Sequence, residues 1–206
     1  TIVKFALFQT LGEPYLFFHR LDSASRMEDG PRRTALFESH VSAGAKMIDF
    51  HGFELPIWYS SIQEEHLDTR GSAGLFDVSH MGFFRFQGED VRSWLSYVST
   101  QEYMKFQPGR CGYCHFLDHS GHIIDDMIFA VSSESEVLGV PNSTMVGIVF
   151  DWLSKLLPED ESISIEDLSE ETSIIAIQGP KSEQVLSEIL GNDNCIGRFR
   201  CQKIAH

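Results

Sequence analysis

The sequence predicts an α+β fold in which mixed or antiparallel sheets are flanked by helices. Short segments rich in β-branched and aromatic residues, bounded by Gly, Asn, Asp or Ser, are typical of strands. Other segments repeat apolar residues at helical spacing. Some consecutive strand segments are separated by turns too short for a helical crossover. This favours antiparallel hairpins over a doubly wound parallel sheet.

Three segments carry the periodicity of amphipathic helices: residues 88–100, 142–158 and 180–191. Each repeats apolar side chains at about i, i+3, i+4 and i+7, which places them on one helix face. The second segment has Ser143 and Thr144 as candidate caps and Pro158 as a stop signal. The third has Pro180 in its first turn and Gly191 at its end, positions that these residue types favour.

Six segments are predicted to be strands: residues 82–88, 113–118, 123–133, 136–142, 163–169 and 173–179. Turn-forming residues at 118–121 and 132–135 separate three of them. We therefore expect these three strands to pair as consecutive hairpins.

The charge composition of the chain indicates which kinds of partner to expect. The chain has 206 residues, ample for a buried core, and 30 acidic against 16 basic residues give a net charge of −14. No run of Lys or Arg reverses this charge, so we expect neither nucleic acid nor a membrane surface as a partner. Four cysteines are too sparse for a secreted disulfide framework, which indicates a reducing compartment.

The first residues differ from the rest of the chain. They lack the basic start and cleavage site of a secretory signal, and Asp22, Glu28 and Asp29 argue against a transit peptide. We expect Met27 to be the natural start, residues 1–26 to be a non-native or disordered extension, and residues 27–206 to form a partial domain.

The adjacent acids Asp125 and Asp126 lie within an otherwise apolar strand segment, IIDDMIFAV. Neighbouring side chains of a strand point to opposite faces, so the two acids cannot share a face. Burying an ionised carboxylate is costly unless it is paired or solvated, so at least one acid should meet a partner or a ligand. The alternative is a strand that begins at Met127 and leaves both acids in a solvated turn.

A second polar motif, LFDVSHMG, brings Asp77, Ser79 and His80 within four residues. A nucleophilic triad usually draws its members from separate segments, which makes a hydrolase the weaker interpretation. The stronger interpretation is a turn in which Asp or Ser bonds to the backbone.

A third motif has the spacing of a zinc site and comprises Cys111, Cys114, His115, His119 and His122. A strand here would turn Cys114 and His115 to opposite faces, and cysteine often packs in cores for its own sake. We expect no metal. Nothing in the sequence matches a phosphate-cradling glycine loop, so we expect no nucleotide cofactor.

Ordered motifs along most of the chain carry a family resemblance. They lie at residues 32–59, 64–70, 75–81, 120–128, 140–142 and 176–186. The first contains Thr-x-Leu-Phe-x-x-His, Gly-x-Lys-Met and Phe-x-Gly-Phe-x-x-Pro, and the fourth is the acidic strand. Together they resemble the amino-terminal, folate-binding part of the glycine cleavage T protein family, the aminomethyltransferases.

The resemblance implies an enzyme that transfers a methylene group from the aminomethyl-lipoyl arm of the H protein to tetrahydrofolate, its co-substrate, and releases ammonia. It implies that Asp126 is the catalytic residue, which holds the reactive folate nitrogens and assists proton transfer. The implied folate-binding residues are Met81, Tyr113, Asp126, Ile128, Val140 and Asn142. Ordinary core packing is the alternative for Met81, Ile128 and Val140, and a helix cap is the alternative for Asn142.

Two departures from the family pattern stand out. His122 replaces a glycine before the acidic pair, so we expect a rebuilt turn. The family's later Gly-Tyr-Thr-Gly-Glu segment, a later substrate-binding Arg and the carboxyl-terminal barrel have no counterpart. We therefore expect a fragment with little activity alone. The expected compartment is the cytoplasm, or the mitochondrial matrix if the source is eukaryotic.

Related functions remain open at this point. A folate-dependent demethylase, or the folate domain of an enzyme that oxidises dimethylglycine or sarcosine, would share the scaffold. A non-catalytic folate-binding protein of iron–sulfur cluster assembly would carry a Lys-Gly-Cys-Tyr-x-Gly-Gln-Glu segment, which the sequence lacks. A structural remnant that binds nothing is a further alternative.

Overall fold

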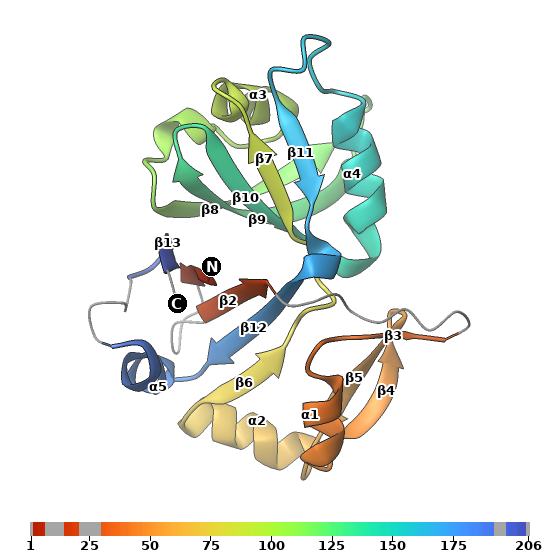
Figure 1. Ribbon diagram of the computed structural model, residues 1–206, viewed down its shortest axis with the longest axis vertical. Coiled ribbons are helices and arrows are strands. Elements are labelled where there is room, and N and C mark those ends of the chain that lie inside the picture. The colour runs from red at the N-terminus through yellow and green to blue at the C-terminus, as the bar shows by residue number, and fades with distance from the viewer. Residues whose placement is uncertain (1, 7–14, 21–29, 192–196, 205–206) are drawn as a thin grey trace. The chain divides into compact units, whose positions relative to one another are not determined.

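The computed structural model describes residues 2–6, 15–20, 30–191 and 197–204 (Figure 1). The chain divides into two compact units, each described here by itself. The first unit comprises Thr1–His80, Glu170–Arg198 and Ile204–His206. The second unit comprises Met81–Ser169 and Phe199–Lys203.

The second unit is built on an antiparallel sheet with the strand order β11-β7-β10-β9-β8-β13. The strands are β7 (Phe84–Gln87), β8 (Arg110–Leu117), β9 (Ile123–Ser133), β10 (Glu136–Pro141), β11 (Ser164–Asp167) and β13 (Arg200–Ile204). β8, β9 and β10 are consecutive hairpins, as the short turns predict. The first of these turns places Gly121 at a φ of 83°. His122, in the position of the family's glycine, donates its backbone N–H to Asp118 Oδ1 at 2.9 Å.

Helices cover one face of this sheet. They are α3 (Val91–Val98), η1 (Tyr103–Lys105), η2 (Ser143–Met145) and α4 (Val146–Ser154). The apolar stripe of α3 lies against β10 and shares one core with the side chains of β9, and Trp94 donates its indole N–H to the Leu156 carbonyl at 2.9 Å. On β9 the core-facing side chains are Met127, Phe129 and Val131, all fully buried. Strand alternation therefore turns Asp126 and Ile128 to the opposite face.

The first unit contains two sheets. One is antiparallel with the order β1-β2-β12-β6, where β1 is Ile2–Ala6, β2 is Tyr15–Arg20, β12 is Thr172–Gln178 and β6 is Gly74–Asp77. The other has the order β3-β5-β4, where β3 is Arg32–Arg33, β5 is Phe53–Trp58 and β4 is Lys46–Phe50. The helices are α1 (Phe37–Ser42), α2 (Ile62–Gly71) and α5 (Ser182–Leu190). The short helix η3 (Ser169–Glu171) precedes β12.

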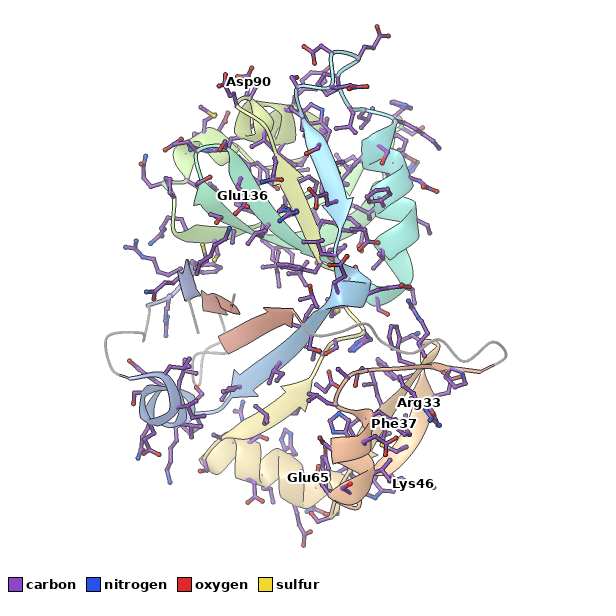
Figure 2. All side chains as sticks on the ribbon, in the orientation of Figure 1. Arg33, Phe37, Lys46, Glu65, Asp90 and Glu136 are labelled. Carbon is purple, nitrogen blue, oxygen red and sulfur yellow. The ribbon has the colours of Figure 1, made fainter. Side chains whose placement is uncertain are left out.

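Side-chain contacts stabilise the segment 33–64 of the first unit. Arg33 stacks its guanidinium 4.0 Å above the centre of the Phe37 ring and donates to Glu54 at 2.6 Å (Figure 2). Ser61 caps α2 by accepting from the Glu64 backbone at 3.2 Å, and its hydroxyl donates to the Glu64 carboxylate. The Ser61 hydroxyl thus satisfies one of the backbone N–H groups that the first turn of α2 leaves without a partner inside the helix.

The predicted α+β class is confirmed, and all three predicted helices and six predicted strands are present with adjusted ends. The third helix begins at Ser182, so Pro180 lies before it rather than in its first turn. Helix α4 ends at Ser154, four residues before Pro158, and has no side-chain cap. Among the described residues no helix is long and apolar enough to cross a bilayer.

Other elements carry no clear sequence signal. Helix α2 has no buried residue, so it shows no apolar stripe, and β4 is largely exposed. Within the proposed non-native extension, the structure describes β1 and β2, while residues 21–26 lie outside the described ranges. The expectation that residues 1–26 are not native stays a prediction.

Candidate functional site

The two acids of β9 point to opposite faces, as predicted. The strand runs from Ile123 to Ser133, so the alternative of a solvated turn is wrong. Asp125 is buried, with 8% of its surface exposed, and accepts hydrogen bonds from Asn142. The backbone N–H of Asn142 lies 3.3 Å from Oδ2, and its side-chain nitrogen lies 2.9 Å from Oδ1. The buried acid is therefore paired, as its desolvation requires.

Asp126 is half-buried on the face that the helices leave free. Its carboxylate accepts a short hydrogen bond from the Tyr113 hydroxyl and a longer one, at 3.3 Å, from the Asn142 side-chain nitrogen. Asn142 thus joins both acids. Asn142 does stand at the N-cap position of the following 3-10 helix, but its side chain bonds to the two acids and not to that helix.

Tyr113 is the hydroxyl donor of this cluster. Burial, the hydrogen bond to Asp126 and the neighbouring carboxylate charges raise its pKa to about 12. The phenol therefore stays protonated at neutral pH and keeps donating to Asp126. Since 47% of Tyr113 is exposed, the cluster is open to solvent and to a ligand.

The sheet register places three more predicted residues in one row. Ile128 lies opposite Tyr113 on one side and opposite Val140 on the other. All three side chains therefore share the face of Asp126. Val140 is almost fully buried and Ile128 is half-buried.

Met81 lies near the site because the next residue, Gly82, packs closely against the end of β10. Gly82 donates its backbone N–H to the Pro141 carbonyl at 3.0 Å, next to Asn142. A Cβ on Gly82 would lie only 2.6 Å from the Pro141 ring and 2.7 Å from Val146, so this close approach requires glycine. The half-buried Met81 is thereby held beside the end of β10.

The sequence interpretation missed His115 as part of this cluster. His115 lies directly opposite Asp126 in the β8–β9 register, and its ring centre is 6.1 Å from that of Tyr113. The alternation of β8 puts positions 113 and 115 on one face, so the strand prediction contained the signal.

The candidate zinc residues are separated by the fold. Cys114 lies in the core, where the Tyr103 hydroxyl donates to its sulfur at 3.2 Å, whereas His115 lies on the other face. His119 packs against Trp152, with ring centres 5.0 Å apart. The described residues include no group of three or more potential metal ligands around one point.

The motif LFDVSHMG forms a turn, as its stronger interpretation predicts. Ser79 donates its backbone N–H to Asp77 at 2.9 Å, and its hydroxyl exchanges hydrogen bonds with the backbone of Ile174. His80 packs edge-on against Phe50. These contacts leave no nucleophilic triad among Asp77, Ser79 and His80.

A polar cluster in the first unit surrounds Asp77. Its buried carboxylate accepts from Thr34 Oγ1 at 2.6 Å and lies 2.9 Å from His40 Nε2. The other ring nitrogen of His40 lies 2.7 Å from the Tyr59 hydroxyl. Desolvation raises the pKa of Asp77, but the hydrogen bonds from His40, Ser79 and Thr34 together hold it below its ordinary value.

Comparison with solved structures identifies the fold. An antiparallel sheet with one helix-covered face, carrying an acid, tyrosine and asparagine cluster on the other face, defines the second unit. The crystal structure of glycine cleavage system aminomethyltransferase T from Bartonella henselae matches this chain with a TM-score of 0.75. The match has 29% sequence identity and covers 82% of this chain and 46% of that one.

Sequence comparison identifies the family. The model described as the GCVT N-terminal domain matches residues 36–205, and the chain belongs to this family. The aminomethyltransferase of Thermotoga maritima is 38% identical over 159 residues, and that of Chlorobaculum tepidum is 41% identical over 159 residues. Each alignment covers 77% of this chain and 43% of the relative. The chain thus spans less than half the length of the curated relatives it matches.

Proposed function

We propose that this chain is the amino-terminal, folate-binding part of a glycine cleavage system aminomethyltransferase. The reaction transfers the methylene group from the aminomethyl-lipoyl arm of the H protein to tetrahydrofolate, with release of ammonia. The observation that carries the proposal is Asp126, a half-buried carboxylate held by Tyr113 and Asn142 on an open sheet face. The names of the matched relatives and their identity to this chain support it.

Each residue of the cluster has a distinct proposed role. Asp126 accepts hydrogen bonds from the N–H groups of the reduced pterin and assists proton transfer as the folate nitrogen attacks the methylene carbon. Tyr113 and Asn142 keep this carboxylate in one orientation. Ile128, Val140 and Met81 offer apolar and polarizable contacts to the flat heterocycle.

The proposal also covers the activity of the isolated polypeptide, its partner and its compartment. The 206-residue polypeptide by itself would have little transferase activity, because the matched relatives are more than twice the length that the alignments cover. Its macromolecular partner would be the lipoylated H protein, and no metal would take part. The compartment would be the cytoplasm, or the mitochondrial matrix of a eukaryote.

Thermal unfolding with and without tetrahydrofolate tests the proposal. A ligand that binds only the folded state adds about 2.7 kcal/mol at a hundredfold excess over its dissociation constant. For a chain of this length, that corresponds to a rise in Tm of roughly 5–10 °C. We expect this rise in the wild type and in Asp90→Asn, an acid on another element of the same unit, but not in Asp126→Asn. A cooperative transition in the wild type that does not move with ligand would contradict folate binding by this polypeptide.

A further inference from the structure

The thiols of Cys111 and Cys201 lie side by side on neighbouring strands, outside the cluster around Asp126. Arg110 of β8 pairs with Arg200 of β13. The backbone N–H of Cys111 donates to Phe199 at 2.8 Å, and that of Cys201 donates to Gly109 at 2.9 Å. This register puts both cysteines on one sheet face as diagonal neighbours. The Cys201 thiol donates to the Val131 carbonyl at 3.6 Å.

The two thiols differ in reactivity. The neighbouring Cys111 thiol and the nearby Lys203 ammonium lower the pKa of Cys201, although burial acts in the opposite direction. Burial raises the pKa of Cys111, which is only 1% exposed. Cys201 is half-buried and can meet a small oxidant. Such an arrangement pairs an accessible attacking thiolate with a protected second thiol.

We propose that Cys111 and Cys201 form a reversible oxidation site at which a peroxide converts the two thiols into a disulfide. The Cys201 thiolate attacks hydrogen peroxide, so that an S–O bond forms, the O–O bond breaks and hydroxide leaves. The sulfur of Cys111 then attacks the resulting sulfenic acid, so that the S–S bond forms, the S–O bond breaks and water is released. Overall, two thiols lose two electrons and two protons, and one peroxide becomes two waters.

The register also predicts that the disulfide is readily reduced. Diagonal neighbours in an antiparallel pair have Cα atoms about 7–8 Å apart, whereas disulfides usually need about 4.4–6.8 Å. The strands must therefore approach each other by about 1 Å to close the bond. A bond formed under such strain is a labile one that a small thiol reductant can reverse.

Peptide mapping of the whole chain after peroxide treatment tests the proposal. Cys195 lies outside the described residues, so the experiment starts from Cys195→Ser to remove a competing thiol. We expect the intact mass to fall by two hydrogen atoms. We also expect a tryptic peptide that begins at Cys111 to be linked to the tripeptide Cys201–Lys203. Dithiothreitol should restore the original mass.

Substitution of single cysteines identifies which thiols form the disulfide. Cys114 is three residues further along the strand and therefore lies on the other face, in the core, so Cys114→Ala should leave the link in place. Cys111→Ser and Cys201→Ser should each abolish it. Fragmentation of the linked peptide between Gly112 and Tyr113 shows, without a variant, whether Cys111 or Cys114 carries the link. A link at Cys114, or oxidation of Cys201 to the sulfinic acid without any link, would overturn the proposal.

Discussion

At the residue scale, the buried carboxylates of Asp77 and Asp125 each accept hydrogen bonds from specific donors. Asp125 and Asp126 are adjacent in sequence yet meet different surroundings, because one faces the core side and the other faces the open side of β9. Asn142 reaches both carboxylates through one amide nitrogen. Substitution of Asn142 should therefore disturb both acids together.

The pairing of Tyr113 with Asp126 predicts a pH dependence at high pH. The pKa of Tyr113 is raised in the folded state to about 12, above its ordinary value of 10.0. The stabilisation from this pair is therefore fully present below about pH 10 and is lost as the pH rises towards 12. Spectrophotometric titration of tyrosinate should show a group with a pKa of about 12 that is absent in Tyr113→Phe, beside the late titration of the buried Tyr103. In Asp126→Asn the Tyr113 phenol should titrate at a lower pH. An unchanged midpoint would show that Asp126 does not raise the pKa of Tyr113.

The Asp77 cluster predicts a loss of stability at low pH. The pKa of Asp77 lies below its ordinary value of 3.8, so its stabilisation is present above that value and is lost as the pH falls through the lower folded-state pKa. At pH 7, Asp77→Asn should lower the free energy of unfolding by about 2–3 kcal/mol, since a buried charged acceptor is lost. Urea unfolding measures the change. Asp68→Asn, the same substitution at an exposed site of the same unit, should change it by less than about 0.5 kcal/mol.

At the element scale, one buried arginine joins helix α3 to the segment around η1. The guanidinium of Arg92 donates to the carbonyls of Tyr103, Met104 and Phe106 at 3.3, 3.3 and 2.6 Å, and it also pairs with Glu134. Only 6% of the Arg92 side chain is exposed, whereas 73% of Glu134 is. The carbonyls, rather than the exposed acid, should therefore account for most of the stabilisation.

Two variants separate these contributions. Arg92→Met should lower the free energy of unfolding by about 2–4 kcal/mol, because several buried carbonyls lose their donor. Glu134→Gln should lower it by less than about 1 kcal/mol, as expected for a solvent-screened pair. Chemical unfolding of both variants gives the comparison. Equal losses in the two would show that the ion pair, and not the carbonyl bonds, ties α3 to η1.

At the scale of the whole molecule, the proposed folate residues all belong to the second unit. They come from Met81 and from β8, β9 and the end of β10, and the first unit contributes none of them. The Asp77 cluster lies in the first unit and has no proposed part in ligand binding. Folate binding should therefore affect the residues around Asp126 much more than those around Asp77.

Hydrogen–deuterium exchange tests this division. With saturating tetrahydrofolate, we expect slower exchange in residues 110–142 than in the free protein, because the bound ligand lowers the population of opened states. Residues 62–77 should change much less. Protection confined to the first unit would contradict the proposed placement of the ligand.

Much of the fold follows from local pattern. The stripe of α3 and the alternation of β9 are visible in sequence because one face of each must be apolar to form the core. Helix α2 and strand β4 were missed because they are largely exposed and carry no such constraint. The acidic pair was visible in the pattern, but the choice of Asp126 and the other site residues came from family resemblance, since nothing local to Ile128 or Val140 distinguishes them from core side chains.

The amino-acid sequence alone established the α+β class, the strand that carries the acids and the rule that Asp125 and Asp126 face opposite ways. Its net charge of −14 led to the expectation that neither nucleic acid nor a membrane surface is a partner, which stays a prediction. The folded chain assigned the partners of each acid. Tyr113 bonds to Asp126 across the β8–β9 pair, His115 lies opposite Asp126 in the same register, and Asn142 bonds to it from the end of β10. Register depends on the pairing of distant segments, so side-chain spacing along one strand cannot reveal it.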